Sequence, residues 1–286
     1  MELPISIIAA QIDAVFDDFD VAAVKTGMLS STAIVEVVAK LLKPQNVTNL
    51  VVDPVMISKT GHALLKPEAI NAMKTQLFPL ALLVTPNIHE AQQLSGIEIK
   101  TLADARRAAK IIHGFGCKHV LIKGGHLLTE RATDLLYDGR FFNVFKGEFI
   151  DTPHTHGTGC TFASAIAAHL ARGKSMNDAV QTAKTYLTEA IRHSLAIGHG
   201  TGPTNHFYFL QPSNRMLKSP PASFSVVRLT CDVPRGYASV AELPAALLNG
   251  LFEHPAGCSH VVSHMHIRAI EGLAYKNSFH FTCWIE

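Results

Sequence analysis

Several features that would indicate a secreted, membrane or nucleic-acid-binding protein are missing from this sequence. The five cysteines are scattered and form no CxxC pair, which argues against a disulfide framework and favours a reducing compartment. The longest apolar run, residues 78–84, is too short to span a bilayer. The 25 basic and 23 acidic residues form no basic run, so neither nucleic acid nor an anionic membrane is indicated as a partner. These absences favour a cytoplasmic protein.

What the 286-residue sequence does contain is a regular alternation of strand-like and helix-like segments, with 48% hydrophobic residues to build a core. Strands are expected at residues 21–25, 50–56, 81–85 and 119–123, and helices at 5–18, 31–42, 67–77, from 87, 101–113, 161–172 and 176–195. This alternation predicts a mostly parallel sheet with helices on both faces. Three short β-prone runs at residues 133–137, 141–145 and 148–151 predict an antiparallel meander at the sheet edge.

Polar residues fall at or near the carboxyl ends of the predicted strands at five places. Ligands of such sheets bind at the carboxyl ends of the strands, so these residues are candidates for one site. The five features are Lys25, Asp53, Asn87 with Glu90, Lys123, and the turn at residues 157–160. Each has an ordinary alternative explanation, such as a strand terminator, a helix first-turn carboxylate or a solvated lysine. Their occurrence together predicts a ligand site.

The turn before the 161–172 helix reads THGTGCT at residues 155–161. Gly157 and Gly159 allow backbone N–H groups to approach an anion closely, and the helix that follows adds its positive end. Cys160 lies at this helix N-terminus, where the dipole and free amides favour a thiolate, so it could serve as a base or as part of an anion hole. The alternative is a turn that only caps the helix.

Together these residue types suit phosphoryl transfer from a nucleotide. Asp53 and Glu90 would hold Mg²⁺ directly or through water, because Mg²⁺ keeps several waters and takes few protein ligands. Lys123 and the glycine amides would offset the charge of the transferring group, and Cys160 would be the base. The sequence has no Walker A, HRD or DFG motif, which excludes P-loop enzymes and protein kinases.

Five motifs also carry a family resemblance. They are KTGML at 25–29, VVDPVM at 51–56, TPNIHEA at 85–91, LIKGGH at 121–126 and THGTGCT at 155–161. In order and approximate spacing they resemble the hydroxymethylpyrimidine/phosphomethylpyrimidine kinases of thiamine biosynthesis, a branch of the ribokinase-like superfamily. The resemblance covers about residues 5–210, including GTGP at 200–203 and His206 near its end.

The resemblance implies a fold and an activity. The fold would be a ribokinase-like three-layer αβα sandwich with a mostly parallel sheet and an antiparallel edge meander. The activity would be ATP- and Mg²⁺-dependent phosphorylation of 4-amino-5-hydroxymethyl-2-methylpyrimidine and then of its monophosphate. The partner would be this small pyrimidine, and ribokinase-like enzymes commonly form homodimers.

Roles for the residues of the glycine-rich turn follow from the same resemblance. Cys160 takes the position of the catalytic base, where most ribokinase-like enzymes have Asp. Gly157 and Gly159 would line the anion hole. Thr158 and Lys123 would contact the nucleotide, the lysine at its phosphates.

The resemblance places the other site residues on the strand-end loops. Asn87 and Glu90 would lie in the Mg²⁺–phosphate region, and Asp53 near the metal and phosphates. Val55 and Met28 would border the pyrimidine. The predicted metal ligands are therefore Glu90 and Asp53.

The family pattern is not matched at either end of the chain. Family members begin with a βαβ portion that carries a glycine-rich substrate loop, so the domain at residues 1–211 is expected to be N-terminally incomplete, with an exposed apolar sheet edge prone to pairing. Residues 212–286 are expected to be a linker and an unassigned extension, in which residues 225–231 and 278–284 alternate like strands.

Two other functions stay open. A pyridoxal-type vitamin kinase uses the same scaffold and a similar cysteine-containing turn. Because the substrate loop is absent from the matched region, a non-catalytic nucleotide-binding or partner protein is the second alternative. Turnover of pyridoxal but not of the pyrimidine would favour the first, and ATP binding without turnover the second.

Overall fold

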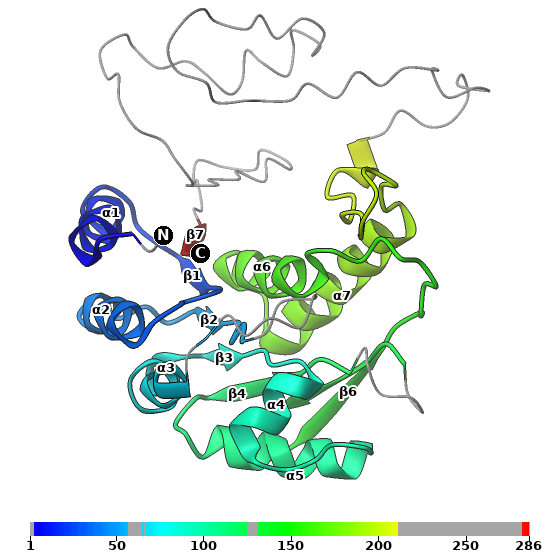
Figure 1. Ribbon diagram of the computed structural model, residues 1–286, viewed down its shortest axis with the longest axis horizontal. Coiled ribbons are helices and arrows are strands. Elements are labelled where there is room, and N and C mark those ends of the chain that lie inside the picture. The colour runs from blue at the N-terminus through cyan, green and yellow to red at the C-terminus, as the bar shows by residue number, and fades with distance from the viewer. Residues whose placement is uncertain (1–2, 57–64, 66, 125–130, 211–281, 286) are drawn as a thin grey trace, which may run out of the picture. The chain divides into compact units, whose positions relative to one another are not determined.

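The computed structural model of this chain describes residues 3–56, 65, 67–124, 131–210 and 282–285. The strand expected at residues 225–231 and most of the extension expected from residue 212 lie outside the described residues. The described part of residues 1–210 forms a sheet with helices on two sides (Figure 1).

Within the described residues the sheet has seven strands in the order β6-β5-β4-β3-β2-β1-β7. Neighbouring strands from β1 to β4 run parallel, and β5 and β6 are antiparallel at one edge. The strands are β1 (Ala23–Thr26), β2 (Leu50–Val52), β3 (Leu83–Val84), β4 (His119–Ile122), β5 (Thr133–Tyr137), β6 (Phe142–Lys146) and β7 (Thr282–Ile285). The mostly parallel sheet is as predicted, with strands shorter than the apolar runs that signal them.

Two groups of helices cover the two faces of this sheet (Figure 1). One face carries α1 (Ile5–Asp18), α2 (Thr32–Leu42), α3 (Pro67–Ala72), α4 (Ile88–Ser95) and α5 (Leu102–His113); the other carries α6 (Thr158–Ala171) and α7 (Met176–Arg192). A π-helical turn (Met73–Leu77) and a 3-10 turn (Phe78–Leu80) continue α3, and another 3-10 turn spans Tyr208–Leu210.

Alternating strand residues divide the core into two layers. Val24 and Val52 pack with the α1–α5 group, whereas Ala23 and Val51 pack with α6 and α7. Successive side chains of a strand point to opposite faces, so apolar runs are needed where both faces are covered. This packing produces the predicted three-layer αβα sandwich.

The predicted edge meander has two of its three strands. β5 and β6 pair from Thr133 with Lys146 to Tyr137 with Phe142. The expected third strand at residues 148–151 is wrong, because this described segment leaves the sheet after the hairpin. Glu148 instead makes an ion pair with Arg192 at the end of α7, at 2.5 Å between Oε2 and Nη2.

The helix of the glycine-rich turn begins earlier than predicted, at Thr158 instead of residue 161. Gly157 is its N-cap and has φ of 81°, a left-handed conformation that favours glycine. This residue lets the chain turn directly into α6. Cys160 therefore lies inside the first turn of the helix.

The edge of β1 that was expected to be exposed is paired in this structure. β7 runs parallel to β1, with register partners from Ala23–Thr282 to Thr26–Ile285. The strand predicted at residues 278–284 thus exists in its described part. Because an unpaired edge presents free backbone groups, pairing by the chain's own C-terminal strand satisfies them.

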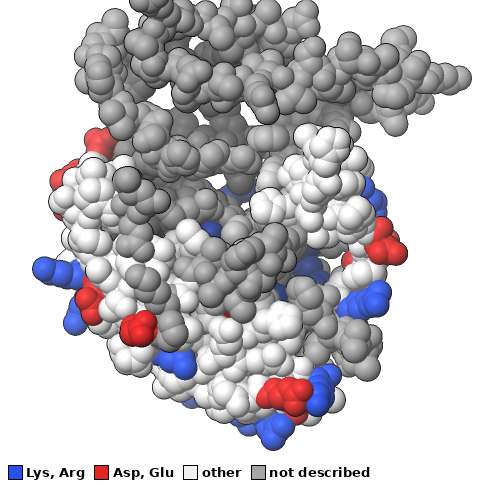
Figure 2. All heavy atoms as spheres, in the orientation of Figure 1, with Lys and Arg blue, Asp and Glu red and all other residues white. Residues whose placement is uncertain are grey.

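Charges of both signs are mixed on the visible face of the described residues. Figure 2 shows basic and acidic side chains interspersed around this face of the described residues. None of the helices in the described ranges is long and apolar enough to cross a membrane.

Candidate active site

The parallel strands bring the predicted polar residues to one edge of the sheet. Thr26 of β1 is in register with Val52 of β2, and Val52 with Val84 of β3. The loops that follow these strands therefore start side by side, and Asn87 forms a parallel bridge with Lys123 after β4. Four strand-end features expected from the sequence meet here.

Lys25 is the exception among the strand-end features. It lies inside β1 and its residue surface is fully buried. The prediction that it ends the strand at the ligand edge is wrong, because β1 continues to Thr26.

A buried ion pair joins two of the predicted site residues. Lys123 Nζ lies 2.7 Å from Asp53 Oδ1, and the same oxygen accepts a hydrogen bond from Thr85 Oγ1 at 3.1 Å. Asp53 is only 1% exposed. A buried carboxylate needs such partners, because removing it from water without them is costly. Sequence reasoning missed Thr85, although its position at the start of the TPNIHEA motif was a signal.

Glu90 has a double role at the start of α4. Its Oε2 accepts from the Asn87 backbone N–H at 2.7 Å, while Asn87 Oδ1 accepts from the Glu90 N–H at 2.9 Å, which completes a capping box. Burial, and secondarily the charge of Asp53, raises the pKa of Glu90 to about 7, although Lys123 and backbone amides oppose the rise. The carboxyl therefore titrates near neutral pH.

Lys123 connects the carboxylates to the glycine-rich turn. A Cβ added at Gly159 would lie 3.4 Å from Lys123 Nζ, so the ammonium group is beside the first turn of α6. Burial opposes its charge, but Asp53, Glu90 and Cys160 outweigh burial and raise the pKa of Lys123. The ammonium group stays charged next to the helix N-terminus.

Cys117 and Cys160 differ in environment. Cys117 is 2% exposed, and burial raises the pKa of its thiol to about 12. Cys160 is half-buried in the first turn of α6, near enough to Lys123 to help raise the pKa of that lysine. Of these two thiols, Cys160 is the one placed at the carboxyl edge of the sheet, beside Lys123.

The remaining predicted residues lie around this centre. Thr158 is the first residue of α6 and is half-buried. Met28 is 40% exposed in the loop after β1, and half-buried Val55 follows β2. The two loops start at neighbouring strands of the sheet.

The segment at residues 202–206 contacts the glycine-rich turn and the start of α6. The His156 N–H donates to the Gly202 carbonyl at 3.0 Å, and His206 Nε2 lies 3.0 Å from Thr161 Oγ1. The Tyr186 hydroxyl of α7 donates to the His206 carbonyl at 3.0 Å. These contacts explain why GTGP and His206 accompany the turn in the sequence.

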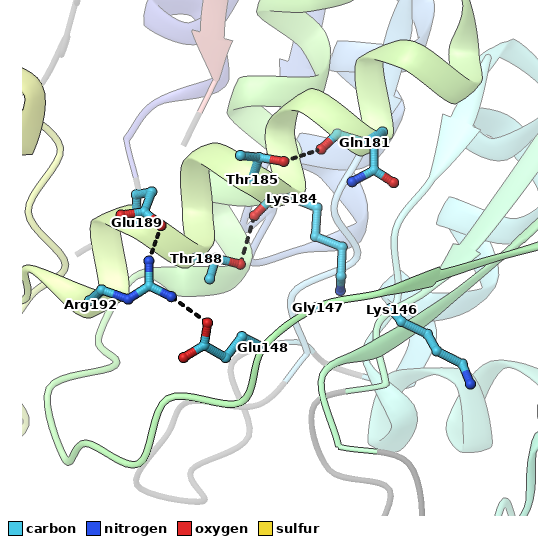
Figure 3. Close-up of a pocket in the computed structure, with 9 residues that line it drawn as sticks. All are labelled: Lys146, Gly147, Glu148, Gln181, Lys184, Thr185, Thr188, Glu189 and Arg192. Carbon is cyan, nitrogen blue, oxygen red and sulfur yellow. Dashed lines mark hydrogen bonds and ion pairs between the residues drawn. The ribbon is translucent and has the colours of Figure 1, made fainter.

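A pocket of about 200 Å³ lies between the end of β6 and α7 (Figure 3). Lys184 points from α7 past Gly147, and Arg192 bridges Glu148 and Glu189. Sequence reasoning missed Lys184, although it falls on the helix face that buries Val180 and Ala183.

Comparison with protein families agrees with this geometry. The family model for phosphomethylpyrimidine kinase matches residues 1–205, more than half of the chain. The chain belongs to the phosphomethylpyrimidine kinase family. As a phosphomethylpyrimidine kinase family member it is an enzyme of the kinase class with a ribokinase-like α/β fold, as predicted.

Similar proteins within and around the phosphomethylpyrimidine kinase family carry different substrate names. The chain is 46% identical over 201 residues to the pyridoxine kinase of Bacillus subtilis, covering 70% of this chain and 74% of the relative. It is 47% identical over 212 residues to the hydroxymethylpyrimidine/phosphomethylpyrimidine kinase of Haemophilus influenzae, covering 72% and 78%. An ADP complex of Bacillus subtilis pyridoxal kinase has a TM-score of 0.68 and 42% identity, covering 74% of this chain and 80% of that one.

The raised pKa of Glu90 has a consequence for stability. A carboxyl whose pKa is raised by folding favours the folded state in its protonated form, so the free energy of unfolding falls as pH rises from about 4.5 to about 7. The full effect is about 3 kcal/mol. Glutamine keeps an oxygen for the Asn87 N–H and carries no charge. Glu90→Gln should therefore raise the Tm by several degrees at pH 8 and hardly change it at pH 4.

The measurement is thermal unfolding at both pH values without added Mg²⁺. The exposed Glu98, changed to Gln, is the matched control and should show no pH-dependent gain. An equal Tm change for Glu90→Gln at pH 4 and pH 8 would contradict the electrostatic explanation.

Proposed function

We propose that this chain transfers the γ-phosphoryl group of ATP to the hydroxymethyl oxygen of 4-amino-5-hydroxymethyl-2-methylpyrimidine, and then phosphorylates the resulting monophosphate. The observation that carries the proposal is the position of Lys123 Nζ, paired with Asp53 at 2.7 Å and beside Gly159 at the N-terminus of α6. A fixed cation and helix amides at one point suit a transferring phosphoryl group, whose charge they offset.

Each residue of the glycine-rich turn has a part in this reaction. Cys160 Sγ accepts the proton of the substrate hydroxyl as its oxygen bonds to the γ-phosphorus and the bond to ADP breaks. The amides around Gly157, Thr158 and Gly159 neutralise the phosphoryl oxygens. Lys123 binds the nucleotide phosphates.

Magnesium is compatible with the donor set at the strand ends. Lys123 and Thr85 both contact Oδ1 of Asp53, so the second carboxylate oxygen of Asp53 could face a cation. Glu90 titrates near neutral pH, and a bound cation would favour the ionised form of Glu90. Two carboxylates are enough for Mg²⁺, which retains several waters. Bound there with Asn87 nearby, Mg²⁺ would neutralise phosphate charge.

The pyrimidine would bind between the loops after β1 and β2, where Met28 and Val55 border it. These loops flank Asp53, so a substrate there would place its hydroxymethyl group toward the phosphate region. We assign the kinase domain to residues 1–211 together with β7, which pairs with β1 in the same sheet.

A pyridoxal-type kinase is the second candidate, because the Bacillus subtilis relative at 46% identity is named pyridoxine kinase. ATP consumption with the pyrimidine, its monophosphate and pyridoxal separates the candidates. We expect kcat/KM to be at least about tenfold higher for the pyrimidine, a difference of about 1.4 kcal/mol in transition-state binding. The reverse order supports the vitamin kinase. ADP binding without turnover of any substrate supports a non-catalytic nucleotide-binding protein.

A further inference from the structure

A buried carboxylate outside the predicted site has two partners that connect it to Lys123. Asp134 of β5 accepts from Lys184 Nζ of α7 at 2.5 Å through Oδ2, and from the Gly124 backbone N–H at 3.0 Å through Oδ1. The side chains of Asp134 and Lys184 are each 8% exposed. Gly124 is the residue directly after Lys123.

The backbone of Lys123 is thereby held on both sides. Its own N–H donates to the Pro86 carbonyl at 2.9 Å, and the next N–H donates to Asp134. A lysine ammonium lies at the end of four rotatable bonds, so its placement beside Gly159 depends on a fixed backbone position. The Asp134 bond fixes the peptide that links Lys123 to Gly124.

The Lys184 side chain passes close to the backbone of Gly147 on its way to the Asp134 carboxylate. A Cβ added at Gly147 would lie 2.7 Å from Lys184 Cε, so glycine leaves the room for it (Figure 3). Burying an ion pair costs solvation that its attraction barely repays, and an apolar pair could fill the same space. An apolar side chain at position 134 could not accept the hydrogen bond from the Gly124 N–H. This hydrogen bond points to a function for Asp134 beyond packing.

We propose that Asp134 is a positioning residue of the kinase: it holds the Lys123–Gly124 peptide so that Lys123 Nζ meets the nucleotide phosphates, while Lys184 orients Asp134. This rests on the proposed function, in which Lys123 contacts those phosphates. Asp134 and Lys184 themselves need touch neither substrate nor nucleotide.

Two double variants test the proposal at constant charge. Asp134→Asn with Lys184→Met removes the ion pair but keeps an oxygen for the Gly124 N–H; Asp134→Leu with Lys184→Met removes both. We expect the Asn variant to keep its kcat/KM for ATP and its Kd for ADP within about threefold of wild type. The Leu variant should lose about 10- to 100-fold in kcat/KM, since a displacement near 1 Å has effects of this size. Equal kinetics and equal ADP affinity would overturn the proposal.

Repeating the comparison in a Lys123→Met background shows whether the effect passes through Lys123. The two double variants should then differ by less than about twofold in Kd for ADP, because contacts that act through one residue are not additive. An undiminished difference in that background would show that the Gly124 bond acts elsewhere, and would overturn the positioning role.

Asp134→Glu covers the case in which the Leu variant does not fold. Glutamate keeps a charge for Lys184 but moves the oxygen away from Gly124, so ADP binding should weaken about fivefold or more, within the range expected for a small displacement. Wild-type ADP affinity for this variant would overturn the proposal. If wild type binds ADP but turns over no substrate, the proposed function fails, while the ADP affinities still decide the role of Asp134.

Discussion

Cys160→Ala is expected to lower kcat for phosphorylation by about 10²- to 10⁴-fold, the usual contribution of a general base. Its thiol lies in the first turn of α6, near Lys123, where the proton of the substrate hydroxyl would be released. Because the side chain acts on the hydroxyl, KM for ATP should change little. Steady-state kinetics with the hydroxymethylpyrimidine measure both values.

Two further variants sharpen the test of Cys160. Cys160→Asp supplies a carboxylate, the base that resemblance to ribokinase-like enzymes places there, and should recover part of kcat. Cys117→Ala removes a buried thiol in the core between the sheet and helices α1–α5. This change should leave kcat unchanged and lower the stability modestly. Full activity of a folded Cys160→Ala protein would show that another group takes the proton.

Lys123→Met is expected to reduce both stability and activity. It leaves Asp53, which is 1% exposed, without its ammonium partner, and breaking a buried pair in this way costs about 3–5 kcal/mol. It also removes the cation beside Gly159, so the Kd for ADP should rise and phosphorylation should fall by at least about 100-fold, as for other charge-stabilising groups. Thermal unfolding and ADP titration measure the two effects separately.

The double variant Asp53→Asn with Lys123→Met separates the two roles. Asparagine can still accept from Thr85, and the unpaired charge of Asp53 is gone, so most of the lost Tm should return. Activity should stay low, because the ammonium group of Lys123 and the Asp53 carboxylate of the proposed Mg²⁺ site are both missing. Recovery of activity together with stability would mean that Lys123 acts only structurally.

Local signals account for much of the fold. The start of α5 was predicted to within one residue because Thr101 and Asp104 form a capping box, and its end at His113 was predicted because Gly114 follows. The α4 cap formed by Asn87 and Glu90 is equally local. By contrast, residues 148–151 resemble a strand locally but lie outside the sheet, where Glu148 pairs with the distant Arg192.

The candidate site divides in the same way. Its motifs could be found from residue types that follow strands, since the carboxyl ends of parallel strands share one edge. The contacts among these residues could not be found in the same way. Lys123 and Asp53 are 70 residues apart in the chain, and nothing in the local sequence shows which lysine pairs with which carboxylate. Thr85 and the Asp134–Lys184 pair were missed for this reason.

The sequence by itself determined the alternation of elements, the phosphate-binding turn and the resemblance to a kinase family, because these depend on periodicity, caps and short motifs. Tertiary structure alone decided that Lys25 is buried, that Lys123 lies between Asp53 and Gly159, and that β7 pairs with β1. These outcomes depend on burial and on pairing between distant segments, which are settled only when the layers pack against one another.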